Sequence, residues 1–213
     1  MKLSIALLES DGKIEQKIAI ALKRKIDKAL QTAANKMVVP IRNRVKAALL
    51  AQPEVASLES GKLQAEFGLP DGGSRIASII DHWVNNITIK KKDARLSRGV
   101  INATFQLQMI KSDYQDVIHK EEAILRTAKG ESLPWLEWLL RFGDKSIITG
   151  FEVQIRNNTR SRTGSALMVQ SKKSWRVPPE FSGTPQNNFV TRALASIEAD
   201  IQNIIEKSVR SVT

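Results

Sequence analysis

The feature that most constrains the fold is a helical pattern of apolar residues that runs from residue 13 to about residue 51. The apolar side chains recur every three or four positions: Ile14, Ile18, Leu22, Ile26, Ala29, Leu30, Ala33 and Met37. This spacing predicts a long N-terminal helix with one apolar face. Pro40 removes a backbone donor and crowds the preceding turn, so we expect a kink or a break there.

Two β-hairpins are predicted after this helix, at 83–110 and 146–170. The clearest strand signal runs from Ile101 to Met109, where apolar and polar residues alternate. Such a period of two is typical of a half-buried strand. Turn-rich and basic residues connect the two strands in each predicted hairpin.

A helical insert is predicted between the hairpins, over 114–143. Its first part runs from Tyr114 to about Lys129, and its second part follows Pro134. Trp135, Trp138 and Phe142 share a face of the second part. This spacing indicates core packing, and a ligand pocket is the less favoured alternative.

The C-terminal part is predicted as an extended arm over 177–186 and a helix over 186–210. The pair Pro178-Pro179 restricts the arm, while Thr184 and Pro185 suit the start of the helix. Together these elements predict a single α+β domain over 1–213, in which the two terminal helices pack on an antiparallel β-sheet of hairpins.

The chain of 213 residues has a formal net charge of +11 and no cysteine. Disulfides and thiolate chemistry are therefore excluded. No apolar stretch approaches the ~18 residues of a membrane span, and the short apolar start predicts an ordered segment rather than a signal peptide.

The positive charge favours an acidic partner or nucleic acid, although an ordinary basic surface stays an alternative. The residues that could contact DNA or an acidic partner are Arg156, Arg160, Arg162, Lys172, Lys173, Lys90, Lys91 and Lys92. Most lie near predicted hairpin tips, from which they could touch a polyanion without reading its sequence.

The sequence offers no clear catalytic or metal site. His82 and His119 are far apart in the chain. Acidic residues lie near His119, so a metal-binding or acid–base role for this histidine is an alternative hypothesis. A solvated histidine on a charged face is the favoured interpretation. We therefore predict a protein that is not an enzyme and has no cofactor.

Three short phrases carry a resemblance to a known family. They are Ser60-Gly61-Lys62-Leu63 after the first helix, Leu140-Arg141-Phe142-Gly143 before the second hairpin, and Asn188-Phe189-Val190-Thr191-Arg192-Ala193-Leu194 at the last helix. The order of these phrases along the chain resembles that in the tail-completion, or neck, proteins of long-tailed bacteriophages. Asn188 replaces the proline usual in that family, and the predicted helix at 114–129 is an insertion.

The resemblance implies a structural virion protein at the head–tail connector, made in the host cytoplasm. Such proteins form rings, here expected to be six- or twelve-fold, between the portal-adaptor complex and the tail-terminator or sheath-end proteins. Double-stranded DNA passes through the ring. Residues of the arm and the following helix start are then candidates for a subunit interface: Pro178, Pro179, Phe181 and Phe189.

Two other functions stay open. A non-specific DNA-binding accessory protein would bind DNA with a steep dependence on salt. An enzyme with an unrecognised site would need His119, or a pair of carboxylates brought together by folding, in a real pocket.

Overall fold

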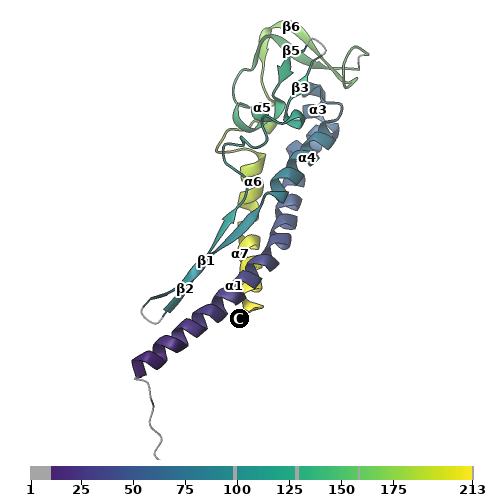
Figure 1. Cartoon of the computed structure of the whole chain (residues 1–213). Helices are drawn as coiled ribbons and strands as arrows, with labels where there is room; N and C mark the ends of the chain where they lie inside the picture. Colours follow the sequence, from purple (N-terminus) through teal and green to yellow (C-terminus); the bar gives the residue numbers. More distant parts are fainter. Residues whose placement is uncertain (1–10, 98–99, 128–129, 158, 213) are drawn as a thin grey trace, which may run out of the picture. The chain divides into compact units, whose positions relative to one another are not determined.

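The structure is a computed structural model that describes residues 11–97, 100–127, 130–157 and 159–212 (Figure 1). It is an α+β chain, with 53% of the residues in helices and 19% in strands, as the sequence predicts. The chain divides into two compact units rather than one. The first contains the chain up to Pro40, Thr88–Gln108 and the chain from Gln202, and the second contains Ile41–Ile87 and Met109–Ile201.

Helix α1 extends over Asp11–Leu50, within two residues of the prediction. The helix is unbroken at Pro40, so the expected break is wrong. Met37 and Ile41, on either side of the proline, have fully buried side chains. Burying each side chain contributes about 1.5–3 kcal/mol, which together offsets the roughly 3 kcal/mol that an interior proline costs.

The first unit contains the hairpin of β1 (Thr88–Ser97) and β2 (Val100–Gln108), which pair antiparallel. The hairpin therefore begins five residues later than predicted. Trp83 instead belongs to α4 (Gly72–Asn85), because Ile76, Ile79, Ile80 and Trp83 continue a helical period and are all buried. In β2, Phe105 and Leu107 are half-buried whereas Thr104, Gln106 and Gln108 are exposed, which confirms the half-buried alternation over 104–108.

A bulge in β1 fastens this hairpin to α1. The register shifts between Lys92 and Arg95, and the N–H of Ala94 in the bulge donates to Asp27 Oδ1 over 3.0 Å. The Lys91 ammonium donates to the same oxygen over 2.6 Å. The contact joins two segments of the first unit, which lie side by side in Figure 1.

We expect acid to loosen this attachment. The Ala94 N–H, and then the Lys91 and Lys23 ammonium groups, hold the pKa of Asp27 well below its usual range. A depressed pKa contributes stability above the unfolded value of about 4 and loses it as pH falls through the folded pKa. Hydrogen exchange of β1 amides should therefore accelerate, relative to intrinsic rates, as pH falls below about 4.

Asp27→Asn should accelerate this exchange already at neutral pH and remove most of its pH dependence. Asp93→Asn is the matched control, because that carboxyl group also contacts Lys91 but its side chain is 87% exposed. If the two variants exchange alike, the Asp27 contacts do not hold the hairpin.

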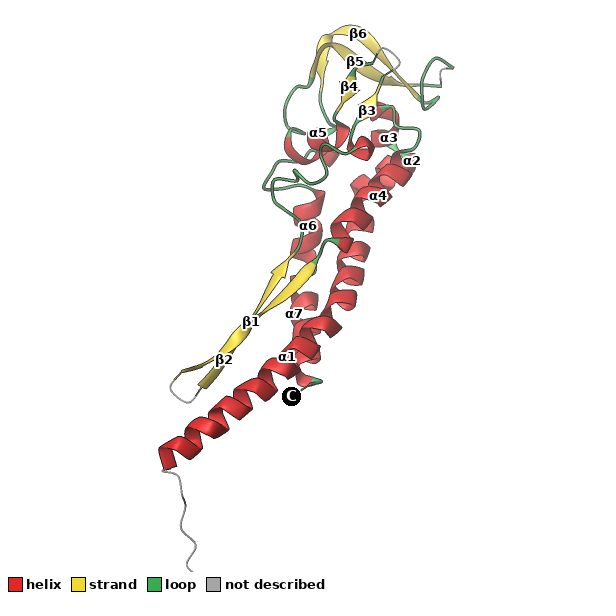
Figure 2. Cartoon of the chain, in the orientation of Figure 1, coloured by secondary structure: helices red, strands yellow, loops and turns green. Residues whose placement is uncertain are grey.

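The second unit carries most of the short elements (Figure 2). Its helices before the strands are α2 (Pro53–Ser60), α3 (Lys62–Phe67) and α4. The elements that follow are η1 (Glu121–Ala123), β3 (Leu125–Arg126), β4 (Ser132–Leu133), α5 (Trp135–Arg141), β5 (Ile148–Ile155), β6 (Ala166–Trp175), η2 (Pro179–Phe181) and α6 (Phe189–Ser196). Helix α7 (Glu198–Arg210) begins in this unit and ends in the first.

The helix predicted from Tyr114 to Lys129 is wrong, whereas α5 confirms the second part of the insert. Turns, η1 and β3 occupy the described residues of the first part. Tyr114 has a φ of 55°, which a regular helix does not allow, and its side chain is buried. Arg75 of α4 donates to the carbonyl oxygens of Glu121 and Ile124. Tertiary contacts thus replace the local helical bonds.

The second hairpin is close to its prediction, although β6 continues to Trp175 rather than ending near residue 170. Strands β5 and β6 are antiparallel, from Ile148 opposite Trp175 to Ile155 opposite Ala166. The register shifts at Gly150, whose φ of 81° favours glycine. The bulge changes which face Phe151 and the following residues share.

The predicted arm and terminal helix both need correction. Val177 and Pro178 are buried, and η2 interrupts the extended backbone. The helix begins at Phe189 instead of residue 186, because Asn188 forms a capping box with Thr191. Ile197 then separates α6 from α7.

Candidate functional site

The predicted basic contact residues fall in both units. Lys90, Lys91 and Lys92 belong to β1, whereas Lys172 and Lys173 belong to β6. Arg156, Arg160 and Arg162 lie in the connection between β5 and β6. The structure thus brings the five residues from 156–173 to one hairpin, and it places the three lysines of β1 in the other unit.

Lys91 and Lys173 are already paired with carboxylates. Lys91 binds Asp27 and Asp93, its side chain is only 9% exposed, and the Asp27 contact raises its pKa. Lys173 binds Glu152 across the hairpin over 2.8 Å, which raises its pKa as well. Arg156, Lys90, Lys92 and Lys172 are exposed, so these residues suit an external polyanion better than Lys91.

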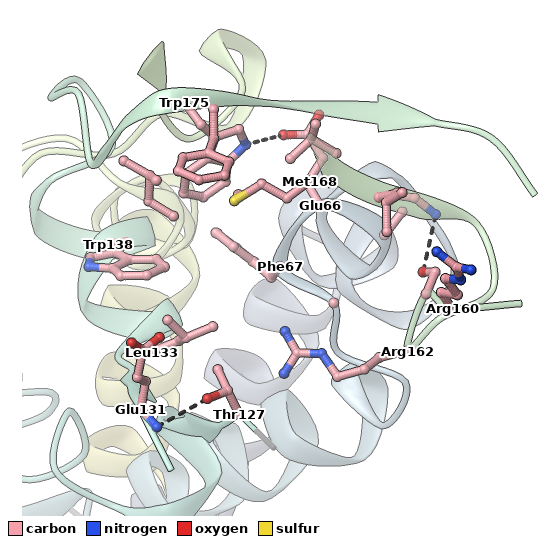
Figure 3. A pocket seen from close by; sticks show the side chains of 18 residues that line it. Glu66, Phe67, Thr127, Glu131, Leu133, Trp138, Arg160, Arg162, Met168 and Trp175 are labelled. Atoms are coloured by element: carbon pink, nitrogen blue, oxygen red, sulfur yellow. Dashed lines mark hydrogen bonds between the residues drawn. The ribbon is translucent and has the colours of Figure 1, made fainter. Parts of the chain in front are cut away.

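A pocket of about 520 Å³ in the second unit is the best candidate site (Figure 3). Three aromatic rings from separate elements form one wall: Phe67 of α3, Trp138 of α5 and Trp175 of β6. The ring centroids of Phe67 and Trp175 are 5.7 Å apart, and those of Trp138 and Trp175 are 5.9 Å apart. Both pairs have the edge-to-face geometry that aromatic rings prefer. We call this cavity the aromatic pocket.

One face of the second hairpin covers the aromatic pocket and extends beyond it. Phe151 and Val153 lie on this face of β5, and Met168 lies opposite Val153 on β6. Ile155 continues the same alternation but does not line the pocket. The exposed fractions are 39% for Phe151, 38% for Met168 and 59% for Ile155. The apolar lining therefore continues onto an open surface.

Glu66 lies at one end of the aromatic pocket, where its carboxylate is already engaged. Trp175 Nε1 donates to its Oε2 over 2.8 Å, and Lys62 Nζ lies 4.0 Å from its Oε1. Burial raises the pKa of Glu66, because few polar groups replace water around the charged form. This carboxylate helps to orient Trp175.

Arg162 supplies the cation at the opposite end. Figure 3 shows its guanidinium directed into the pocket, toward Phe67 and Thr127. The guanidinium lies against Gly68, where a Cβ atom would come within 3.0 Å of Nη2. Partial burial lowers its pKa, and no described acidic side chain pairs with it. Arg160 and Glu131 also line the cavity.

The two histidines bond to neighbouring polar side chains, and His119 lines a small pocket of about 330 Å³ together with Arg75 and Glu121. His119 is exposed and bonds to Gln115, while His82 Nε2 lies 3.0 Å from Asn86 and 3.8 Å from Asp116. The described part of the chain contains no group of three metal-ligating side chains.

The aromatic face predicted at 135–142 divides between two roles. Trp135 is core, as expected, whereas Trp138 lines the aromatic pocket. No sequence pattern predicts that Trp138 lies near Phe67 and Trp175. The only hint of a shared site in the sequence is that all three residues are aromatic.

Two of the four residues proposed for a subunit interface are buried inside the second unit. Phe189 is 1% exposed and packs near Trp83, with 6.3 Å between ring centroids. Pro178 is buried, Phe181 is half-buried and Pro179 is exposed. Phe189 is therefore a core residue of its own chain.

None of the helices in the described ranges combines the length and apolar character needed to cross a membrane. Comparison with known proteins finds no family model, curated protein or solved structure that matches this chain.

Proposed function

We propose that this chain is a structural assembly protein that associates with copies of itself, and that it works as a ring-forming component of a phage neck. The neck assignment rests on the resemblance of its short phrases to tail-completion proteins. Self-association rests mainly on one observation, the exposed apolar side chains of α1.

In the N-terminal part of α1, Ile18, Ile20 and Leu22 are 61%, 46% and 47% exposed. Ile18 and Leu22 are one helical turn apart and share a face, whereas Ile20 lies on the other side of the helix by its spacing. Asp27, which binds the hairpin of the same unit, lies on the opposite side of the helix by its spacing. An apolar face left open in this way marks an interaction surface.

The hairpins give independent support. In the described chain, β1 pairs only with β2 and β5 only with β6. A two-stranded sheet is marginally stable alone and has unpaired backbone groups along both edges. Contacts with other subunits would cover such edges.

Charge is compatible with DNA in transit. Lys90, Lys92 and Arg95 are exposed on β1, and the chain carries a net charge of +11. Contacts with phosphates are independent of sequence and weaken with salt. The same exposed lysines favour the second candidate, a DNA-binding accessory protein.

The double variant Ile18→Lys/Leu22→Lys should abolish self-association. Two buried ammonium groups at a subunit contact would cost several kcal/mol in total, enough to reduce association at least about a hundredfold. Mass photometry across a range of concentrations measures the oligomers. Gln16→Lys/Gln31→Lys adds the same charge at exposed polar positions of α1 and should still associate. A wild-type chain that stays monomeric at all concentrations would contradict the proposal.

The neck assignment has its own test, electron microscopy of lysates from a phage with an early stop codon in this gene. Filled heads separate from complete tails would support it. Normal joined particles would overturn it and leave DNA binding by the purified chain as the leading candidate.

A further inference from the structure

The aromatic pocket has the properties of a recognition site that self-association through α1 does not use. We propose that it binds a segment of a partner protein in which a large apolar side chain is followed by a carboxylate. This proposal does not depend on the neck assignment, because it rests on the second unit alone.

The apolar part of the ligand follows from the walls. A cavity of about 520 Å³ lies in the range that holds a bulky side chain or a small ligand. Phe67, Trp138 and Trp175 offer ring faces and edges, and Met168 also lines the cavity. Met adapts its shape to an inserted group. An aromatic or branched aliphatic side chain fits this lining.

The carboxylate follows from the charges. Glu66 is engaged by Trp175 and lies near Lys62, whereas Arg162 has no acidic partner among the described residues. A guanidinium binds a carboxylate through two parallel hydrogen bonds, and the low polarity of the aromatic walls strengthens them. Arg160 adds a second cation to the lining. The positive net charge of the whole chain favours the same acidic partner.

A protein segment suits this site better than a small molecule, because the apolar surface does not end at the pocket. It continues along the hairpin face through Phe151 to Ile155, which is 59% exposed. Within the described sheet, the outer edges of β5 and β6 are also unpaired. An extended peptide could occupy the pocket with one side chain and cover the neighbouring face with the next.

The test uses the full chain and a fluorescent, end-blocked heptapeptide with Leu-Phe-Glu at its centre. We expect saturable binding by fluorescence anisotropy. Replacing the peptide's Glu by Gln, or Arg162 by Gln in the protein, should each weaken binding about tenfold, the equivalent of one lost charged pair of 1.4 kcal/mol. The Gln peptide and the Arg162→Gln protein together should bind only slightly more weakly than when either change is made alone, because both changes remove the same charged pair.

Arg156→Gln is the matched control, because Arg156 lies in the same connection but does not line the pocket. It should leave binding unchanged. Phe151→Ser tests the apolar face at a partly exposed position and should weaken binding while circular dichroism stays native. No saturation up to about 1 mM peptide, equal affinity for the Gln peptide, or equal effects of Arg156→Gln and Arg162→Gln would overturn the proposal.

Discussion

Replacing Asn188 by alanine should lower the free energy of unfolding of the second unit by about 3 kcal/mol. The Asn188 side chain is fully buried and serves both as a cap and as a bridge. Its Oδ1 accepts from the N–H groups of Val190 and Thr191, which caps α6. Its Nδ2 donates to the carbonyl oxygens of Leu140 and Thr184 and contacts the Tyr114 hydroxyl.

The magnitude follows from these two roles. Losing a helix cap costs about 1 kcal/mol. Each buried polar group left without a partner costs about 1–3 kcal/mol, and alanine would leave the Leu140 carbonyl and the Tyr114 hydroxyl in that state. Water entering the gap would recover part of the loss, so the sum is about 3 kcal/mol rather than more.

Chemical denaturation measures the effect as a shift of the midpoint at unchanged slope. Asn188→Ser separates the two roles, because its hydroxyl can still cap α6 but cannot reach all the groups that the amide bridges. It should therefore fall between the wild type and alanine. Asn187→Ala, at the exposed neighbouring position, should cost less than about 1 kcal/mol. If it costs as much as Asn188→Ala, the bridging role is wrong.

The same asparagine explains why the start of the last helix was mispredicted. Thr184 followed by Pro185 is a good local signal for a helix start, yet both precede the observed start at Phe189. Asn188 caps α6 through Val190 and Thr191 and is also held by bonds to Leu140 and Tyr114, which are 48 and 74 positions away. Local propensity cannot register partners at that separation.

Elements with a long, regular period were predicted well for the opposite reason. The stripe of α1 repeats over many turns, and the alternation in β2 persists over most of the strand. Tyr114, in contrast, begins a stretch whose apolar spacing resembles a helix. Its positive φ arises from packing beside Trp83 and bonding to Asn188, and neither contact is local.

Most of the candidate site could not be predicted from the sequence either, because its residues are brought together by contacts that are distant along the chain. Lys90, Lys91 and Lys92 are equivalent in sequence, but only Lys91 faces Asp27, 64 positions away. The aromatic pocket combines Phe67, Trp138 and Trp175, which come from three elements. Charge and residue type indicated Arg162 as a contact residue, but its position beside aromatic rings required the fold.

Replacing Arg192 by alanine should destabilise the second unit nearly as strongly as Asn188→Ala, because it would leave a buried charge alone. Glu54 is 1% exposed, and its Oε1 accepts a hydrogen bond from Arg192 Nη2. Its Oε2 is also buried and has no hydrogen-bond partner among the described residues. Arg192 is therefore the group that compensates this carboxylate.

Breaking a buried ion pair from one side costs about 3–5 kcal/mol. The Arg192 side chain is 40% exposed, so water can approach the abandoned carboxylate, and we expect the lower end, about 3 kcal/mol. Glu54→Gln should cost less, because it removes the buried charge and leaves an arginine that can turn toward solvent. The double variant Glu54→Gln/Arg192→Ala should then be more stable than Arg192→Ala alone.

Denaturant midpoints of the wild type, the two single variants and the double variant form a double-mutant cycle, which measures the interaction energy between Glu54 and Arg192. A coupling of about 1–2 kcal/mol or more would show that Arg192 acts by compensating Glu54. Additive effects would mean that Arg192 stabilises α6 through other contacts, such as its bond to Asn187. In that case the ion pair between Glu54 of α2 and Arg192 of α6 would not be what joins these two helices. Their apolar contacts would then have to hold them together.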